Sequence, residues 1–163
     1  MNKARNDIGD SARPGQDTRR SIPDSHLPAD RGLPPIPDGW PRGSGYSHAV
    51  VAEGRQIFVA GQIGWDPVTR TVVPGGMTAQ ARQAFQNIVA VLAAAGATPD
   101  SIVRLTWFIT DRDAYLRDTT AIGAAYREVI GRHFPAMSVL VVSALLEPGA
   151  VIEIEATAVV PAH

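Results

Sequence analysis

The sequence predicts an α+β fold in which two helices cover one face of a single mixed β-sheet. Two segments, 78–95 and 113–130, repeat apolar residues at helical spacing, and Gly96 and Gly131 follow them as stop signals. Short runs of β-branched and aromatic residues precede, separate and follow these helices, which gives the order β-β-α-β-α-β-β. The helices leave the other sheet face bare, and such a face usually meets a second copy of the chain.

Residues 134–160 carry the strongest β-strand signal. Two apolar runs flank the turn cluster Glu-Pro-Gly-Ala at 147–150 and predict a β-hairpin. The second run alternates, so one of its faces should pack beneath the helices. That face comprises Ile152, Ile154, Ala156, Ala158 and Val160. The opposite face carries Glu153 and Glu155, and because buried carboxylates need hydrogen-bond partners, this face either meets water or lines a site.

The first two strands are expected at 46–51 and 56–60, with a turn at Glu53-Gly54. Gly61 and Gly64 follow closely and indicate a β-bulge or a close backbone approach. A third strand is expected at 102–110, where IVRLTWFIT is β-branched and aromatic. The apolar stripe of the first helix is formed by Ala81, Ala84, Phe85, Ile88, Leu92 and Ala95, and that of the second by Tyr115, Ile122, Tyr126 and Val129.

Length and composition bound the class of protein. The 163 residues suffice for one domain with a sizeable core, and the net charge of −1 provides no basic field for nucleic acid or an anionic membrane. The absence of cysteine excludes disulfides, thiol catalysis and cysteine-ligated metals, and His26, His133 and His163 lack metal-ligand spacing. No run approaches the roughly 20 apolar residues of a membrane span, and no secretory signal is evident. We expect a cytoplasmic protein without metal or cofactor.

Residues 1–38 differ in composition from the remainder, with six prolines, charges of both signs and few large apolar residues. Such a segment cannot bury enough surface to offset its chain entropy. We therefore expect a disordered or loosely draped extension at 1–38 and one folded domain at 39–163.

Several short motifs resemble the Rid (YjgF-type, reactive intermediate deaminase) family over residues 45–160. They are YSHAV at 46–50, VAGQI at 59–63 with Asp66-Pro67, ARQAFQN at 81–87, FITD at 108–111, FPA at 134–136 and IEIEA at 152–156. Each motif is weak alone, but their order and spacing are specific. The resemblance implies a chorismate-mutase-like fold and a homotrimer whose sheets form a central barrel with three clefts between subunits. It also implies hydrolysis of imines and enamines to ammonia and a ketoacid without a metal or cofactor.

The sequence departs from the family pattern at the substrate anchor. In the deaminase members, the Phe-Pro-Ala turn continues with an arginine that binds the substrate carboxylate bidentately. Met137 holds that position here and offers only a flexible apolar wall. A mid-helix asparagine of the family is matched by Gly123, and a cysteine by Val139, whose backbone carbonyl can still hold a water. Arg104 or Arg132 is the alternative anion partner.

Glu153 is the candidate catalytic residue, because it matches the family position that orients the hydrolytic water. Imine hydrolysis needs a water delivered to the electrophilic carbon and a proton relayed to the departing nitrogen, and one carboxylate can do both. The alternative is a structural carboxylate bonded to backbone across the trimer. Glu155, one pleat further along, fits a structural role.

The candidate substrate-binding residues are Tyr46, Gly61, Trp65, Met137, Ser138 and Val139. Tyr46 either hydrogen-bonds a ligand or packs at the subunit seam, and Gly61 either admits a ligand to the backbone or marks a bulge. Trp65 could roof the pocket, whereas Trp107 fits core or seam packing. His48 fits a structural role better than a functional one.

Two functions agree with these features. One is an enzyme that hydrolyses an imine, enamine or related labile C–N bond of a small metabolite held by apolar and aromatic contacts. The other is a non-catalytic trimer that binds a small molecule or a partner protein. The retained Glu153 and Tyr46 favour the enzyme, and the lost arginine favours the binding protein.

Overall fold

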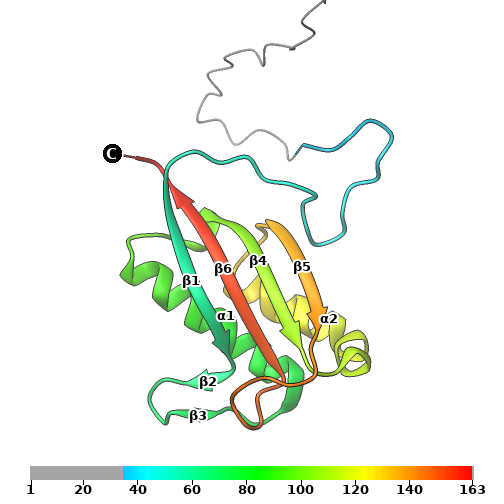
Figure 1. Cartoon of the computed structure of the whole chain (residues 1–163), viewed down its shortest axis with the longest axis vertical. Helices are drawn as coiled ribbons and strands as arrows, with labels where there is room; N and C mark the ends of the chain where they lie inside the picture. Colours follow the sequence, from blue (N-terminus) through cyan, green and yellow to red (C-terminus); the bar gives the residue numbers. More distant parts are fainter. Residues whose placement is uncertain (1–34, 163) are drawn as a thin grey trace, which may run out of the picture. The chain divides into compact units, whose positions relative to one another are not determined.

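The computed structural model describes residues 35–162, so the expectation for the N-terminal extension lies almost wholly outside the described range. Four strands form one mixed sheet in the order β1-β6-β4-β5, and two helices cover one of its faces (Figure 1). The predicted α+β architecture is confirmed. The sheet consists of β1 (Arg55–Ile63), β4 (Ile102–Ile109), β5 (Ala136–Val141) and β6 (Ile152–Val160), and the helices are α1 (Gly76–Ala94) and α2 (Arg112–Val129). A small hairpin, β2 (Trp65–Asp66) with β3 (Thr71–Val72), and a 3-10 turn at Pro99–Ser101 complete the described elements.

The predicted helical stripes form the core. In α1, the stripe from Ala81 to Leu92 is fully buried, while Ala95 lies at the helix end and is only partly covered. In α2, Ile122, Ala125 and Tyr126 are buried. The α2 N-terminus is capped by Asp111, whose carboxylate accepts from the backbone N–H of Asp113 and Ala114 at 2.9 Å each. Both helices thus begin and end within two residues of the predicted limits.

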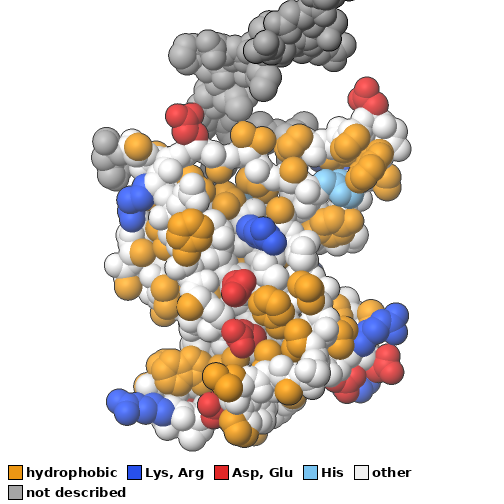
Figure 2. Space-filling view, viewed as in Figure 1, with side chains coloured by type: hydrophobic (Ala, Val, Ile, Leu, Met, Phe, Trp, Pro, Cys, Tyr) orange, Lys and Arg blue, Asp and Glu red, His pale blue; other side chains and the backbone are white. Residues whose placement is uncertain are grey.

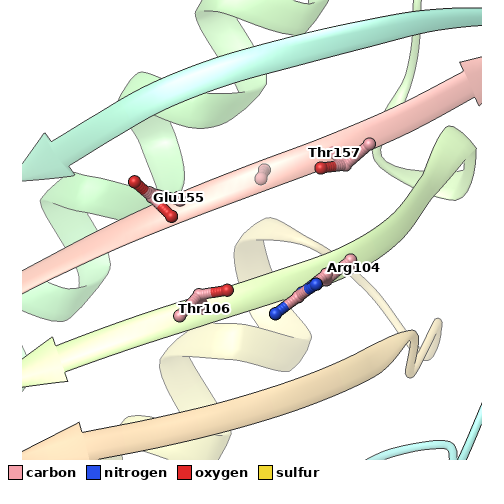
Figure 3. A pocket seen from close by; sticks show the side chains of 5 residues that line it. Arg104, Thr106, Glu155 and Thr157 are labelled. Carbon is pink, nitrogen blue, oxygen red and sulfur yellow. The ribbon is translucent and has the colours of Figure 1, made fainter.

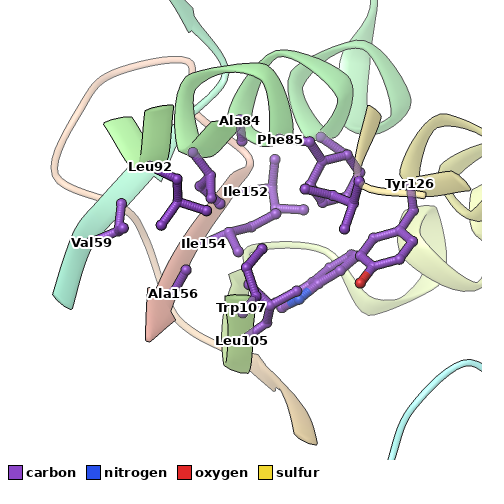
Figure 4. Close-up of a cluster of buried hydrophobic side chains, with 14 of the residues drawn as sticks. Val59, Ala84, Phe85, Leu92, Leu105, Trp107, Tyr126, Ile152, Ile154 and Ala156 are labelled. Carbon is purple, nitrogen blue, oxygen red and sulfur yellow. The ribbon is translucent and has the colours of Figure 1, made fainter. Parts of the chain in front are cut away.

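The alternating pattern of β6 is also confirmed, since the five residues predicted for the inner face are all buried. They pack beneath α1 with Leu105, Trp107 and Ile109 of β4 (Figure 4). Trp107 makes ring contacts with Phe85 at 5.3 Å and Tyr126 at 6.4 Å, so the prediction of core packing is right. Its indole N–H finds no hydrogen-bond partner within residues 35–162.

The predicted C-terminal hairpin is wrong. β5 pairs in parallel with β4 at the sheet edge, and β6 lies between β1 and β4 in antiparallel pairing with both. The chain β4-α2-β5 is a βαβ unit, in which the helix carries the chain back so that the two strands run in parallel. The turn cluster at 147–150 therefore lies in a longer connection that crosses the end of β4, where the backbone N–H of Thr110 donates to Val151.

The predicted first hairpin is wrong too, because residues 46–51 form no strand. Ser47 makes a single parallel bridge to Ala136, its backbone N–H donates to Pro135, and its hydroxyl donates to Phe134 at 2.6 Å. The segment is thereby fixed at the β5 edge and runs along the end of the sheet before entering β1 (Figure 1). At Gly54 a side chain would collide with the backbone of Val160, so the absence of a side chain lets the chain approach β6 closely as it enters β1.

No helix in the described part of the chain is long and apolar enough to cross a bilayer.

Candidate active site

The sheet face opposite the helices is open and combines charge with apolar surface. Figure 2 shows charged side chains of both signs in the middle of this face, with hydrophobic side chains on either side. Phe58 on β1 is 75% exposed and Leu140 on β5 is 44% exposed. Exposed aromatic and aliphatic groups around a polar centre are typical of a surface that a partner covers.

Glu153 and Gly61 meet on this open face. Glu153 pairs with Ile63 of β1 and Phe108 of β4, and its side chain is partly buried. The register of the β1–β6 pair shifts between Val59 and Gln62, so Gly61 lies in a β-bulge, one of the two alternatives that its sequence context indicated. A methyl group at position 61 would overlap the Glu153 carboxylate. That carboxylate makes no hydrogen bond or ion pair with other residues of the 35–162 range.

Buried amides on α1 fix the chain around this pair. Gln80 donates to the carbonyl of Gly149 and accepts from the N–H of Val151, at 2.9 Å each, and so positions the entry into β6. Asn87 donates to the carbonyls of Ile63 and Trp65 at 3.2 and 2.9 Å, which fixes the exit from β1. Trp65 is therefore held beyond the bulge, at the Glu153 end of the sheet.

The three candidates on β5 alternate across the edge strand. Met137 pairs with Leu105 and packs partly against the core, so it lies on the helix-covered face. Ser138 pairs with Thr106 and lies on the open face, exposed. Val139 pairs with Trp107, again on the helix side, and is 43% exposed because no further strand covers the edge. Sequence reasoning grouped these residues by position alone and overlooked the alternation.

Tyr46 belongs to the β5 edge, close to the bridge between Ser47 and Ala136. Its ring makes an edge contact with His48 at 5.4 Å, and His48 makes another with Trp40. The His48 ring also hydrogen-bonds the carbonyl of Pro41 through Nε2 at 3.0 Å. These contacts give His48 a structural role, and they surround a small hollow that Tyr46, Arg42 and Phe134 line.

The candidates therefore form two groups in one chain. Gly61, Glu153 and Trp65 belong to β1, β6 and the hairpin beyond β1, whereas Tyr46, Met137, Ser138 and Val139 belong to the β5 edge. β6 and β4 separate β1 from β5, so the protomer does not bring the two groups together. Within residues 35–162, no group of histidine and acidic side chains is arranged to hold a metal ion.

Residues 41–160 match the family model described as endoribonuclease L-PSP. The chain belongs to this family, which includes the Rid proteins. A 2-iminobutanoate/2-iminopropanoate deaminase of Capra hircus is 39% identical over 114 residues, covering 70% of this chain and 79% of the relative. The RutC family protein UK114 of Drosophila melanogaster is 41% identical, covering 69% and 78%.

Solved Rid structures share the fold. A Yersinia pestis protein of the Rid family, YyfB, described as of unknown function, aligns with a TM-score of 0.64 at 37% identity, covering 71% of this chain and 87% of that one. RidA from a Psychrobacter species aligns with a TM-score of 0.58 at 32% identity, covering 72% and 89%.

Arg127, next to Gly123 on α2, was not considered as a cation in the sequence interpretation. The Arg127 guanidinium lies beside Gly123, where its nitrogen would be 3.4 Å from a side-chain carbon at position 123. Arg104, in contrast, extends from the open face, and Arg132 is exposed in the connection before β5. The sequence signal for this contact is the four-residue spacing of Gly123 and Arg127. Residues four apart on a helix are neighbours, and a glycine leaves room for a long side chain.

Proposed function

We propose that this chain is a cofactor-independent hydrolase that cleaves an imine, enamine or related labile C–N bond of a small metabolite. The observation that carries the proposal is the Glu153 carboxylate, which lies against the Gly61 backbone on the open face without a partner in residues 35–162. The relatives named as imine deaminases support it. The net charge of −1 speaks against RNA as the substrate, because phosphate backbones are bound chiefly by basic residues.

The chemistry needs one carboxylate and one water. Glu153 accepts a proton from the water as its oxygen attacks the carbon of the protonated imine, which gives a neutral carbinolamine. The same carboxyl group then returns the proton to nitrogen and takes up the hydroxyl proton as the C–N bond breaks, so that ammonia and a carbonyl compound leave. Gly61 has no side chain, so the Glu153 carboxylate can lie directly against the β1 backbone.

We infer that the working unit is a homotrimer. The two groups of site residues lie on different parts of the protomer surface, so a head-to-tail contact is needed to join them. Head-to-tail contacts whose rotation closes form a ring. In a ring of three, each cleft takes Glu153 and Gly61 from one copy and Tyr46, Met137, Ser138 and Val139 from the next. The exposed Phe58 and Leu140 become buried in the same contact.

The substrate in this cleft is not anchored by arginine at position 137. Met137 contributes no charge-assisted hydrogen bond, which elsewhere supplies about 1.5–3 kcal/mol, or roughly ten- to a hundredfold in affinity. We therefore expect slow turnover of small 2-imino acids and a better fit for substrates whose recognition is apolar or aromatic.

Ammonia release from freshly generated imines tests the proposal. We expect the wild type to hydrolyse an apolar imine faster than 2-iminopropanoate, and Met137→Arg to gain affinity for pyruvate by about tenfold or more. Glu153→Gln should keep ligand binding and lose turnover, because an amide cannot accept the water's proton. Fast wild-type turnover of 2-iminopropanoate would mean that another cation, Arg104 or Arg132, holds the carboxylate.

A binding protein is the second candidate function, and the replacement of the arginine by Met137 favours it. In that case no imine would release ammonia above the uncatalysed rate, while calorimetry would still detect a ligand in the cleft. Glu153→Gln would then change neither the rate of ammonia release nor the ligand binding measured by calorimetry.

A further inference from the structure

We propose that Arg104 of one copy forms an ion pair with Glu155 of a neighbouring copy across the open face, and that this pair selects the partner copy. The inference rests on the homotrimer of the proposed function and identifies the charges that hold it in register. It concerns residues outside the catalytic group, since Glu155 lies two positions beyond Glu153 on β6.

Both charges lie in one shallow depression of the open face. Arg104 and Thr106 of β4 line it together with Glu155 and Thr157 of β6 (Figure 3). On the ladder, Arg104 pairs with Thr157 and Thr106 pairs with Glu155, so the two charges are diagonal neighbours. Arg104 and Glu155 are both exposed, and neither makes an ion pair with a residue of the 35–162 range.

The surroundings require that these charges find partners once the face is covered. A charge enclosed in an interface without a counter-charge loses several kcal/mol of solvation. The flanking apolar groups, Phe58 and Leu140, are large and exposed, so the face is built to be covered. An uncompensated Arg104 or Glu155 would oppose that contact.

A second copy of this chain is the occupant that the charges favour. Each copy carries both signs within one depression, so in a head-to-tail contact one copy can offer Arg104 and the next copy Glu155. A partner with one predominant charge would satisfy only one of the two. In a closed ring of three copies the pair repeats at every boundary, giving three arginines and three glutamates around the axis.

Charge reversal tests this pairing by light scattering of the full-length chain. Arg104→Glu and Glu155→Arg should each dissociate the trimer and weaken assembly about a hundredfold or more, because like charges then face each other at three boundaries. The double variant Arg104→Glu/Glu155→Arg should be trimeric again. Arg112→Glu is the matched control, since it reverses an exposed charge at the start of α2 and should leave the trimer intact.

Mixing the two single variants decides whether the pair joins two copies. A mixed trimer has one like-charged boundary in place of three, so the mixture should recover trimer that neither variant forms alone. Recovery in the double variant without recovery in the mixture would place the pair inside one protomer and overturn the inference. Single variants that remain trimeric would also overturn it, while leaving the hydrolase proposal intact. A monomeric wild type would refute the trimer itself.

Discussion

Gly61 and Glu153 occupy each other's space on the open face, and this contact makes the glycine a sensitive position. Gly61→Ala would place a methyl group where the carboxylate lies, so the Glu153 side chain must move. We predict a loss of ammonia release of at least about tenfold, since small misplacements of a catalytic group are costly. The fold should persist, because the carboxylate can swing toward open space. An unchanged rate of ammonia release would contradict a catalytic role for Glu153.

Gly123→Ala is the matched glycine control. Its new methyl group would lie 3.4 Å from the flexible end of Arg127, an ordinary contact, and Gly123 lies inside α2. Alanine favours the helix over glycine by roughly 0.5–1 kcal/mol, so the melting temperature should rise slightly. Activity should stay near the wild-type rate.

Single residues differ in how far the sequence could place them. The position of Glu153 opposite the packed face follows from strand alternation and was predicted, whereas the bulge at Gly61 was one of two alternatives. The opposite orientations of Met137 and Ser138 follow from the same alternation, but only once the strand partner is known. The position of Arg127 depends on the rotation of α2 against the sheet, which the sequence of α2 alone does not define.

Helix α1 controls the entry into β6 through Gln80, and this link can be broken separately from the core. Gln80→Leu would leave the carbonyl of Gly149 and the N–H of Val151 without their partner. We predict a loss of about 2 kcal/mol in the free energy of unfolding, with slower turnover because Glu153 follows two residues later. Chemical denaturation measures the free energy of unfolding, and ammonia release measures the turnover.

Gln83→Leu provides the comparison for Gln80. Gln83 lies one turn along the same helix and donates only to the side chain of Asn87. Gln83→Leu should lower the free energy of unfolding by much less than Gln80→Leu and should not alter turnover. Equal losses in the two variants would mean that the link to β6 contributes nothing specific.

The aromatic cluster between α2 and the sheet predicts a pH dependence. Tyr126 donates to the carbonyl of His133 at 2.6 Å, and burial raises the pKa of its phenol well above the ordinary value. The folded state holds the phenol neutral, so its stabilisation is complete below about pH 10 and is lost as the unfolded chain ionises above that pH. Tyr126→Phe should therefore lower the free energy of unfolding at pH 7 by roughly 1–3 kcal/mol. The stability of this variant should also fall less steeply at high pH. Burial also raises the pKa of Tyr115, which accounts for the remaining slope.

Elements were predictable where the signal is local, and pairings were not. The stripe on α1 and the alternation of β6 each lie within one segment, and both are found. The placement of β6 between β1 and β4 depends on contacts between segments far apart in the chain. The Glu-Pro-Gly-Ala cluster predicted a short hairpin because turn residues mark a change of direction without fixing the length of the connection.

At the scale of the whole molecule, the divided site predicts an obligate assembly. A protomer of 17.3 kDa leaves the open face and the β5 edge uncovered, and the candidate residues are divided between these two parts of the surface. Light scattering at micromolar concentration should give about three times the protomer mass. A stable monomer that still releases ammonia from imines would contradict the shared cleft.

Complementation between two inactive variants tests the central claim most directly. Glu153→Gln removes the catalytic group on one side of the cleft, and Tyr46→Ala, or Ser138→Trp if Tyr46→Ala stays active, disables the other side. In equal random mixing, half of the copies keep Glu153 and the other half keep an unaltered β5 edge. Each cleft takes its face from one copy and its edge from the next, so about a quarter of the clefts are complete. The account predicts ammonia release at about a quarter of the wild-type rate after mixing and refolding. Activity no higher than the sum of the separate variants would contradict a site built from two subunits.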